Sequence, residues 1–359
     1  MNDLLSKIWL KETNPLLLTL QDWELLLSQA GRGALLARLF QHLSDSGWMS
    51  QVPPVVAEQL AGPCVFAARH QTEVVDEVER IRRAAAQCTG TIILLKGAAY
   101  LVAGLPPSRG RVFSDIDLMV RRDEIPMVES ALLGAGWISK ERDSYNQRYY
   151  RQWMHEVPPL VHIIRASAID LHHTITPPTS RFAVNADRLY EQLAPTRFDN
   201  VFTLGPADMV LHSAVHLFQE GEFGHGLRDL LDLKDLLQFF EQQKDFWPKL
   251  LVRASELGLQ IPLSHALFHI ERLFKVSPPR ELAQQVRQLG SSASSRHIMA
   301  WLLSLALRPD HPSCDTRWTN LARWLLYMRS HALRMPVHLM VPHLVRKAWM
   351  RHFQKKPAH

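Results

Sequence analysis

Three aspartates lie in short segments where polar and apolar residues alternate, and their spacing suggests metal chemistry. Asp115 and Asp117 are separated by one residue in the segment 115–120, and Asp170 lies in the segment 169–172. Because side chains alternate along a strand, Asp115 and Asp117 would point to the same face. Neighbouring carboxylates repel each other unless a cation lies between them, and magnesium prefers carboxylate oxygens together with substrate phosphates.

The third aspartate would complete a two-metal site if its strand lies beside the first. Two carboxylates would then bridge the ions, and the third would complete one ion and help to deprotonate an attacking hydroxyl. We therefore predict that Asp115, Asp117 and Asp170 are catalytic and bind two Mg²⁺ ions. The competing interpretation is a solvent-facing edge strand, because Asp-x-Asp alone is a weak motif. His172 shares a face with Asp170 and either donates to a phosphate or orients Asp170.

Basic residues before the aspartate pair are candidates for binding phosphate. Lys96-Gly97 follows the apolar run 91–95, and Arg111 closely precedes Asp115. The glycine allows backbone amides to approach a phosphate, the lysine supplies positive charge, and the arginine can fork onto a terminal phosphate. The ordinary alternative for each residue is a solvated position at a strand end or in a surface loop.

Hydrophobic periodicity predicts helices on both sides of a central segment that contains strands. Residues 15–85 and the chain after Pro206 have apolar residues at spacings of three and four, which is typical of helices. Short apolar runs between them, bounded by turn residues, indicate strands. The predicted strands are 91–95, 115–120, a stretch from Trp137, 145–153, 160–164 and 168–172; the predicted helices among them are 98–104 and 124–133, with a loop over 106–110.

This order predicts an α+β fold, in which a small mixed β-sheet core is flanked by N- and C-terminal helical regions. The 359 residues exceed the usual single-domain size of roughly 100 to 200 residues. We expect an N-terminal helical region over 1–88, an α/β core over 89–203, a helical domain over 204–315 and a basic, aromatic-containing helical tail over 316–359.

The C-terminal tail carries an excess of positive charge. The chain has 41 Lys and Arg against 35 Asp and Glu, a net charge of +6 that suits phosphate-bearing ligands without identifying nucleic acid. From Arg317 to the end there are nine Lys or Arg and no acidic residue. Two interpretations of the segment 317–356 are open: contact with an anionic membrane surface or RNA, or a helical cap that buries its aromatics and leaves its arginines solvated.

The remaining composition indicates a cytoplasmic protein, at most peripheral to a membrane. The three cysteines, Cys64, Cys88 and Cys314, are far apart, which argues against a disulfide framework or a zinc knuckle. Charged residues interrupt the apolar stretches of the first 20 residues, unlike a signal peptide. The longest uncharged, mostly apolar run, 297–307, is shorter than the roughly 20 residues that a membrane-spanning helix needs.

The order of the central motifs resembles a known family. Leu95-Lys-Gly97, Arg111 with Ser114-Asp-Ile-Asp-Leu118, and Ile169-Asp-Leu-His172 resemble the uncharacterised nucleotidyltransferase family of bacteria, a branch of the polymerase-beta-like superfamily. The resemblance covers residues 15–240. It implies magnesium-dependent transfer of a nucleoside monophosphate from a nucleoside triphosphate such as ATP to a hydroxyl, with release of pyrophosphate.

The resemblance places Lys96, Gly97, Arg111, Ser114 and His172 at the nucleotide, and it leaves the acceptor open. A small molecule, an RNA end and a protein side chain all fit. Many members of the superfamily have Gly-Ser or Gly-Gly at the position of Lys96-Gly97, so either Lys96 replaces the missing serine contact or triphosphate binding is weaker. The alternatives are a nucleotide-binding protein without turnover and an interaction scaffold with the same fold.

Two weaker patterns lie on the helices after the core. His212 and His216 are four apart on a predicted helix and could bind one metal, but no third ligand is evident nearby, so we favour His216 as a packed or site-facing residue. Arg228, Asp229 and Asp232 either face the cleft or form ordinary pairs on a helix surface.

Overall fold

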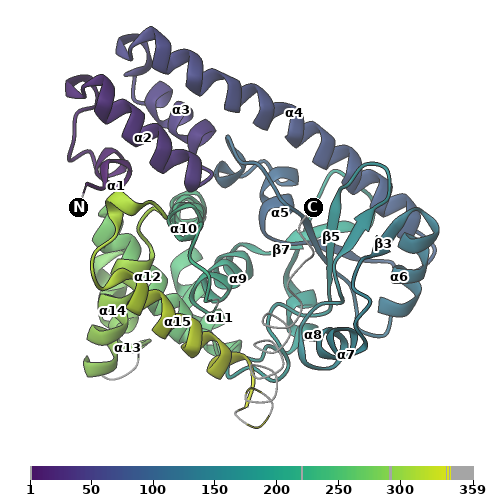
Figure 1. Ribbon diagram of the computed structural model, residues 1–359. Coiled ribbons are helices and arrows are strands. Elements are labelled where there is room, and N and C mark those ends of the chain that lie inside the picture. Colours follow the sequence, from purple (N-terminus) through teal and green to yellow (C-terminus); the bar gives the residue numbers. More distant parts are fainter. Residues whose placement is uncertain (1, 220, 291–292, 337, 339, 341–359) are drawn as a thin grey trace.

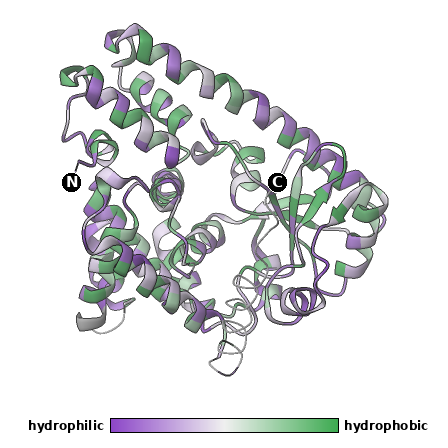
Figure 2. Cartoon of the chain, viewed as in Figure 1, coloured by the Kyte–Doolittle hydropathy of each residue, from purple (hydrophilic) through white to green (hydrophobic). Residues whose placement is uncertain are grey.

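The computed structural model describes residues 2–219, 221–290, 293–336, 338 and 340. It contains a mixed β-sheet with helical regions at both ends of the chain (Figure 1), which confirms the α+β fold class. Hydrophobic and hydrophilic residues are interspersed along the helices (Figure 2), as expected for helices with one face against a core. Among the described residues, no helix has both the length and the apolar character needed to cross a bilayer.

The sheet positions the aspartate segments next to each other. Its seven strands have the order β3-β4-β5-β2-β1-β7-β6. β2 pairs with β5 in parallel and with β1 in antiparallel orientation, and β1 pairs with β7 in parallel. β2 is therefore an interior strand, and the edge-strand interpretation of Asp115 and Asp117 is wrong. The strands are β1 (Ile92–Leu94), β2 (Ile116–Met119), β3 (Trp137–Ser139), β4 (Leu160–His162), β5 (Ala168–His172), β6 (Leu193–Pro195) and β7 (Val201–Leu204).

The first four helices form a hydrophobic cluster of their own, separate from the core of the sheet, and the fourth helix extends to the sheet. Their buried residues pack together with Leu227 and Leu231 of α10 (Gly226–Phe240), so these helices are joined to the C-terminal helices as well. The long helix α4 runs from this cluster to the sheet (Figure 1). The helices are α1 (Leu4–Trp9), α2 (Leu20–Arg32), α3 (Leu36–Asp45) and α4 (Pro54–Ala85).

The helices after the sheet share its hydrophobic core. Buried residues of α9 (Pro206–Gln219), α10 and α12 pack with those of the strands and of the second half of α4. A single apolar core therefore holds the sheet against the helical side of the molecule. The other helices are α5 (Lys96–Val102), α6 (Ile125–Gly134), α7 (Ser144–Trp153), α8 (Ala186–Leu189), α11 (Phe246–Glu256), α12 (Gln260–Phe274), α13 (Ala283–Gln288), α14 (Ala293–Ala306) and α15 (Thr319–Arg334), with 3₁₀ turns at 15–17, 49–51, 106–108, 190–192, 280–282 and 312–314.

One predicted strand is wrong, because residues 145–153 form helix α7. Aromatic residues favour strands in general, and this segment is rich in them. Here Asp143 caps the helix by accepting a hydrogen bond from the amide of Asn146 at 3.0 Å. Tyr149 and Trp153, four residues apart, make an edge-to-face ring contact with centroids 6.0 Å apart. The aromatic spacing is thus helical.

In the described part of the tail, two tryptophans are exposed and one arginine is bound to the rest of the molecule. Trp318 and Trp324 are 43% and 57% exposed. Arg329 instead donates from Nη1 to the carbonyl oxygen of Phe218 at 2.7 Å, and burial lowers its pKa to about 10. The prediction of buried aromatics and solvated arginines is therefore wrong for Trp318, Trp324 and Arg329, whereas Arg317 is exposed as predicted. Residues 337, 339 and 341–359 lie outside the described residues.

Candidate active site

The aspartates of the two motifs lie on neighbouring strands. Asp117 on β2 is the register partner of Asp170 on β5, and Asp115 immediately precedes β2. The predicted adjacency of the two strands is thus confirmed. All three side chains line one cavity of about 440 Å³. Asp117 is 5% exposed, so its carboxylate is withdrawn from solvent.

The pKa of Asp170 indicates that the negative charge of the three aspartates is not fully compensated. Burial and the charges of Asp117 and Asp115 together raise this pKa to about 7, against the opposing effect of Lys96. A carboxylate with such a pKa is in a position where its negative charge is poorly compensated. A divalent cation would supply the missing positive charge, so these residues fit a magnesium site.

Asp117 differs because two side chains already stabilise its charge. Burial opposes ionisation, but the charge of Lys96 and a hydrogen bond from His172 outweigh it and hold the pKa of Asp117 well below its ordinary value. Lys96 Nζ lies 2.8 Å and His172 Nε2 lies 3.0 Å from Asp117 Oδ1. His172 is fully buried and does not line the cavity, so it contacts Asp117 where the sequence suggested Asp170 or a phosphate.

Lys96 and Gly97 begin helix α5, whereas the helix was predicted to begin at residue 98. Lys96 has φ of +45°, a left-handed conformation that favours glycine. A Cβ on Gly97 would lie 2.4 Å from Cδ1 of Phe113, so only glycine leaves room for that ring. Backbone strain of this kind costs about 1–3 kcal/mol and is found mainly at functional sites.

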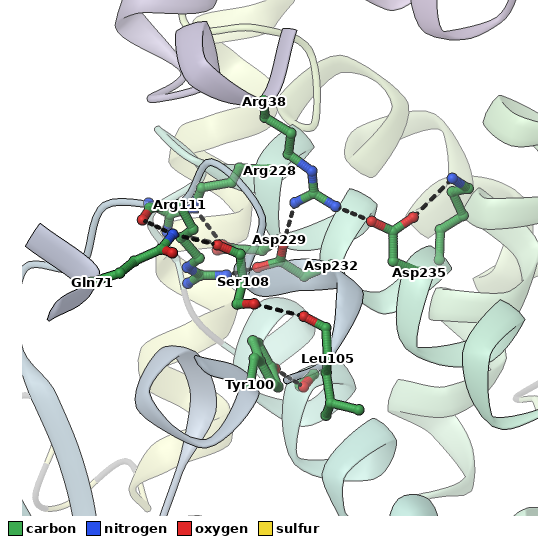
Figure 3. Close-up of polar contacts among 12 residues, drawn as sticks. Arg38, Gln71, Tyr100, Leu105, Ser108, Arg111, Arg228, Asp229, Asp232 and Asp235 are labelled. Carbon is green, nitrogen blue, oxygen red and sulfur yellow. Dashed lines mark hydrogen bonds and ion pairs between the residues drawn. The ribbon is translucent and has the colours of Figure 1, made fainter. Parts of the chain in front are cut away.

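Arg111 is held in the cavity by residues from distant parts of the chain. It is ion-paired with Asp232 of α10, which is also ion-paired with Arg38 of α3 (Figure 3). Its guanidinium lies 5.7 Å from the ring centroid of Tyr100. Burial and the neighbouring charge of Arg228 lower the pKa of Arg111 to about 10. At neutral pH the guanidinium therefore keeps its charge.

Helices α3 and α4 fix the loop that carries Arg111. Gln71 Nε2 donates to the carbonyl oxygens of Ser108 at 2.7 Å and of Arg111 at 3.1 Å (Figure 3). Gly110 has φ of +67°, and a Cβ there would lie 2.8 Å from the backbone of Ala37. The N-terminal helices thus act as a support for the phosphate-binding candidates, which the sequence did not indicate.

The cavity combines negative and positive side chains. Seven carboxylates and four Lys or Arg side chains line it, so its net charge favours cations. Ion pairs within the cavity join Lys96 to Asp117, Arg111 to Asp232, and Arg228 to Asp229. The lining contains the predicted Lys96, Gly97, Arg111, Ser114, Asp115, Asp117, Asp170, His216, Arg228, Asp229 and Asp232, together with Tyr100, Val112, Phe113, Met154, His155, Glu156, Ser213, Glu222 and Arg334.

One predicted contact, that of Ser114, takes a different form, and the pair on α10 faces the cavity. Ser114 is exposed and donates to Asp115 Oδ1 at 2.9 Å, so its hydroxyl orients a carboxylate. Arg228 and Asp229 form an ion pair with atoms 2.9 Å apart inside the cavity, which supports the cleft-facing interpretation.

Glu156 and His155 were missed by the sequence analysis. They follow α7, and Glu156 forms an isolated antiparallel bridge with His172. Glu156 Oε2 lies 3.6 Å from His172 Nε2 and 3.8 Å from His155 Nε2. These three side chains are close enough together to hold a metal ion. Metal-binding histidines generally use their second nitrogen in a hydrogen bond. Here Nδ1 of both histidines is buried without a partner, so the aspartates are the better metal site.

The histidine pair on α9 does not form a metal site. His212 and His216 have ring centroids 6.4 Å apart in an edge-to-face arrangement. No group with metal-ligand spacing includes either of them within the described ranges. Burial, with the charge of Lys96, holds the pKa of His212 well below its ordinary value, whereas His216 lines the cavity as expected.

Comparison with known proteins identifies the family. The sequence model of a family described as "Uncharacterised nucleotidyltransferase" matches residues 19–275. The chain belongs to this nucleotidyltransferase family. No curated protein and no solved structure matches it. The matched residues include the whole sheet and α9 and α10, so the cavity of this nucleotidyltransferase is built almost entirely from the family region, with Arg334 outside it.

Proposed function

We propose that the protein is a Mg²⁺-dependent enzyme that transfers a nucleoside monophosphate from a nucleoside triphosphate to a hydroxyl of an acceptor. The observation that carries the proposal is the register of Asp117 with Asp170 across β2 and β5, with Asp115 beside them in one cavity. Bound by these three carboxylates, Mg²⁺ would neutralise phosphate oxygens and activate the hydroxyl. Membership of a nucleotidyltransferase family supports the reaction class.

The residues around the aspartates have distinct parts in the proposal. Asp170 is the candidate that accepts the proton of the acceptor hydroxyl, because it lies in register with Asp117 and lines the same cavity. Arg111, whose guanidinium is fixed by Asp232, binds phosphate by charge-assisted hydrogen bonds. His172 orients Asp117 through the hydrogen bond to Oδ1. The ammonium of Lys96, which pairs with Asp117 Oδ1, would bind an oxygen of the triphosphate if a metal ion took its place at that carboxylate.

One observation favours a second candidate, a nucleotide-binding protein without turnover. The ammonium of Lys96 lies 2.8 Å from Asp117 Oδ1, where it occupies an oxygen that a metal ion would use. If this ion pair persists when nucleotide binds, a complete two-metal site does not form. The two candidates differ in whether pyrophosphate is released.

The test is incubation of the full chain with each labelled triphosphate, Mg²⁺ and a cell extract, beginning with ATP. We expect label in one acceptor fraction, be it small molecule, RNA or protein, together with release of pyrophosphate. Asp115→Asn and Asp117→Asn should abolish both, whereas the exposed Asp123→Asn should change neither. Nucleotide binding without any labelled fraction would support the second candidate, and unchanged Mg²⁺-dependent nucleotide binding in both site variants would refute the proposal.

A further inference from the structure

The C-terminal helix α15 reaches the cavity although it lies outside the family match. The match ends at residue 275, and α15 spans Thr319–Arg334. Arg334, the last residue of the helix, lines the same cavity as the three aspartates. In Figure 1 the helix crosses the C-terminal helical side and ends near the centre of the lower edge. A residue far from the family region thus contributes to the candidate active site.

Hydrogen bonds to the rest of the molecule fix this end of the helix. The hydroxyl of Thr179 donates to the carbonyl oxygen of Arg334 at 2.7 Å, and the amide of Arg181 donates to the carbonyl oxygen of Leu333 at 2.9 Å. The last carbonyls of a helix have no partner within it, so these bonds satisfy them. One turn earlier, Arg329 is anchored to the carbonyl oxygen of Phe218. The backbone of Arg334 is therefore held in one position relative to the cavity.

The charge of Arg334 acts on the wall formed by the segment after α7. Burial lowers the pKa of His155 well below its ordinary value, and the charges of His172, Lys96 and Arg334 lower it further. Burial raises the pKa of Tyr149, and Arg334 opposes that rise. The guanidinium thus supplies positive charge on the side of His155, whereas Arg111 lies beside Arg228 and Asp229. The two guanidinium groups of the cavity thus have different neighbours: His155 and Tyr149 for Arg334, and Arg228 and Asp229 for Arg111.

We propose that Arg334 binds a phosphate group in the active site, so that α15 forms part of the substrate-binding surface. The inference rests on the proposed function, because it takes the cavity to be a site for phosphorylated substrates. A guanidinium fits phosphate better than an ammonium does, since its planar fork donates two parallel hydrogen bonds. The phosphate belongs either to the triphosphate of the donor or to a phosphorylated acceptor.

Titration calorimetry on full-length variants tests the assignment. We compare Arg334→Ala and Arg334→Lys with Arg317→Ala, a control at an exposed arginine just before the same helix. The first arm titrates each nucleoside triphosphate and inorganic pyrophosphate in the presence of Mg²⁺. The second arm titrates glycerol phosphate into protein saturated with a non-hydrolysable triphosphate. Thermal unfolding of each variant establishes that the fold is retained.

We expect Arg334→Ala to weaken phosphate binding about tenfold or more, as for the loss of a charge-assisted hydrogen bond, and Arg334→Lys to fall between. A loss in the first arm assigns Arg334 to the donor, and a loss confined to the second arm assigns it to the acceptor. Unchanged binding in both arms overturns the inference, while loss of triphosphate binding in Asp117→Asn would still leave the proposed function intact. If the wild-type protein binds no triphosphate, the proposed function fails together with the inference.

Discussion

The burial of Asp170 and its repulsion by Asp117 and Asp115 predict that removing its charge stabilises the metal-free protein. In Asp170→Asn the side chain keeps its shape and loses its charge. The pKa of Asp170 is raised from 3.8 to about 7 by burial and by the charges of Asp117 and Asp115. Below pH 3.8 the carboxyl is neutral in both the folded and the unfolded protein, so the free energy of unfolding is not affected.

The size of the effect follows from the same values. Above pH 7 the carboxylate is charged in both states, but the charge is less favourable in the folded protein than in the unfolded chain. A rise in pKa from 3.8 to about 7 corresponds to a loss of about 4 kcal/mol in the free energy of unfolding, at about 1.4 kcal/mol per pKa unit. Because Asp170 is partly exposed, solvent screens the repulsion, and we expect about 1–3 kcal/mol. The penalty develops as the pH rises from 3.8 to about 7 and is complete above that range.

Urea unfolding in EDTA, measured in steps from about pH 5 to about pH 8.5, gives the test. The advantage of Asp170→Asn over the wild type should grow up to about pH 7 and then stay constant. Addition of Mg²⁺ should stabilise the wild type more than the variant, by about 2.7 kcal/mol at a concentration of about 100 times the dissociation constant. Asp123→Asn, at an exposed position, is the matched control. A variant less stable than the wild type at pH 8 in EDTA, or an advantage independent of pH, would refute the reasoning.

Substitutions at three further positions, two at the site and one in the helical region behind the sheet, are tested by urea unfolding. Lys96→Gly and Lys96→Ala both remove the ammonium, but only glycine suits a φ of +45°. The glycine variant should therefore be more stable than the alanine variant by about 1 kcal/mol. Equal stability of the two variants would contradict backbone strain at this position. Gly97→Ala should lose about 1–3 kcal/mol because a Cβ would lie 2.4 Å from the ring of Phe113, and an unchanged midpoint would mean that the ring moves freely. Arg253→Ala should lose about 3–5 kcal/mol because it leaves Asp208 buried without the guanidinium 2.7 Å away; a loss below about 1 kcal/mol would show that solvent replaces the pair.

Local patterns in the sequence were sufficient for the strands that carry the aspartates. Residues 168–172 were predicted as a strand and form β5 with the same bounds. The prediction was correct because the alternation of polar and apolar residues indicates which side chains face the core. β6 and β7 were not predicted, since β6 has three residues, includes Pro195 and lies at the edge of the sheet, where pairing depends on its neighbour. In α7 the general preference of aromatic residues for strands misled the prediction, although Asp143 is a recognisable helix cap.

The site was predictable where its residues follow a motif along one strand. Contacts between distant segments were not, because periodicity carries no information about which helix faces which strand. Arg38 reaches Asp232 only because α3 packs near α10. Glu156 comes beside His172 through a single bridge after α7. Arg334 enters the cavity because α15 ends there, which no pattern within that helix indicates.

Lys96 connects the strain, the charge and the chemistry of the site. Its ammonium lies 2.8 Å from Asp117 Oδ1, so in the absence of metal it supplies part of the positive charge that the aspartates need. The backbone of Lys96 has a φ of +45°, which strains any residue except glycine. The ion pair of its ammonium with Asp117 offsets part of that strain energy. A lysine in this place therefore stabilises the metal-free cavity and competes with the metal for one oxygen. The strained backbone and the competition with the metal are thus two consequences of one residue, Lys96.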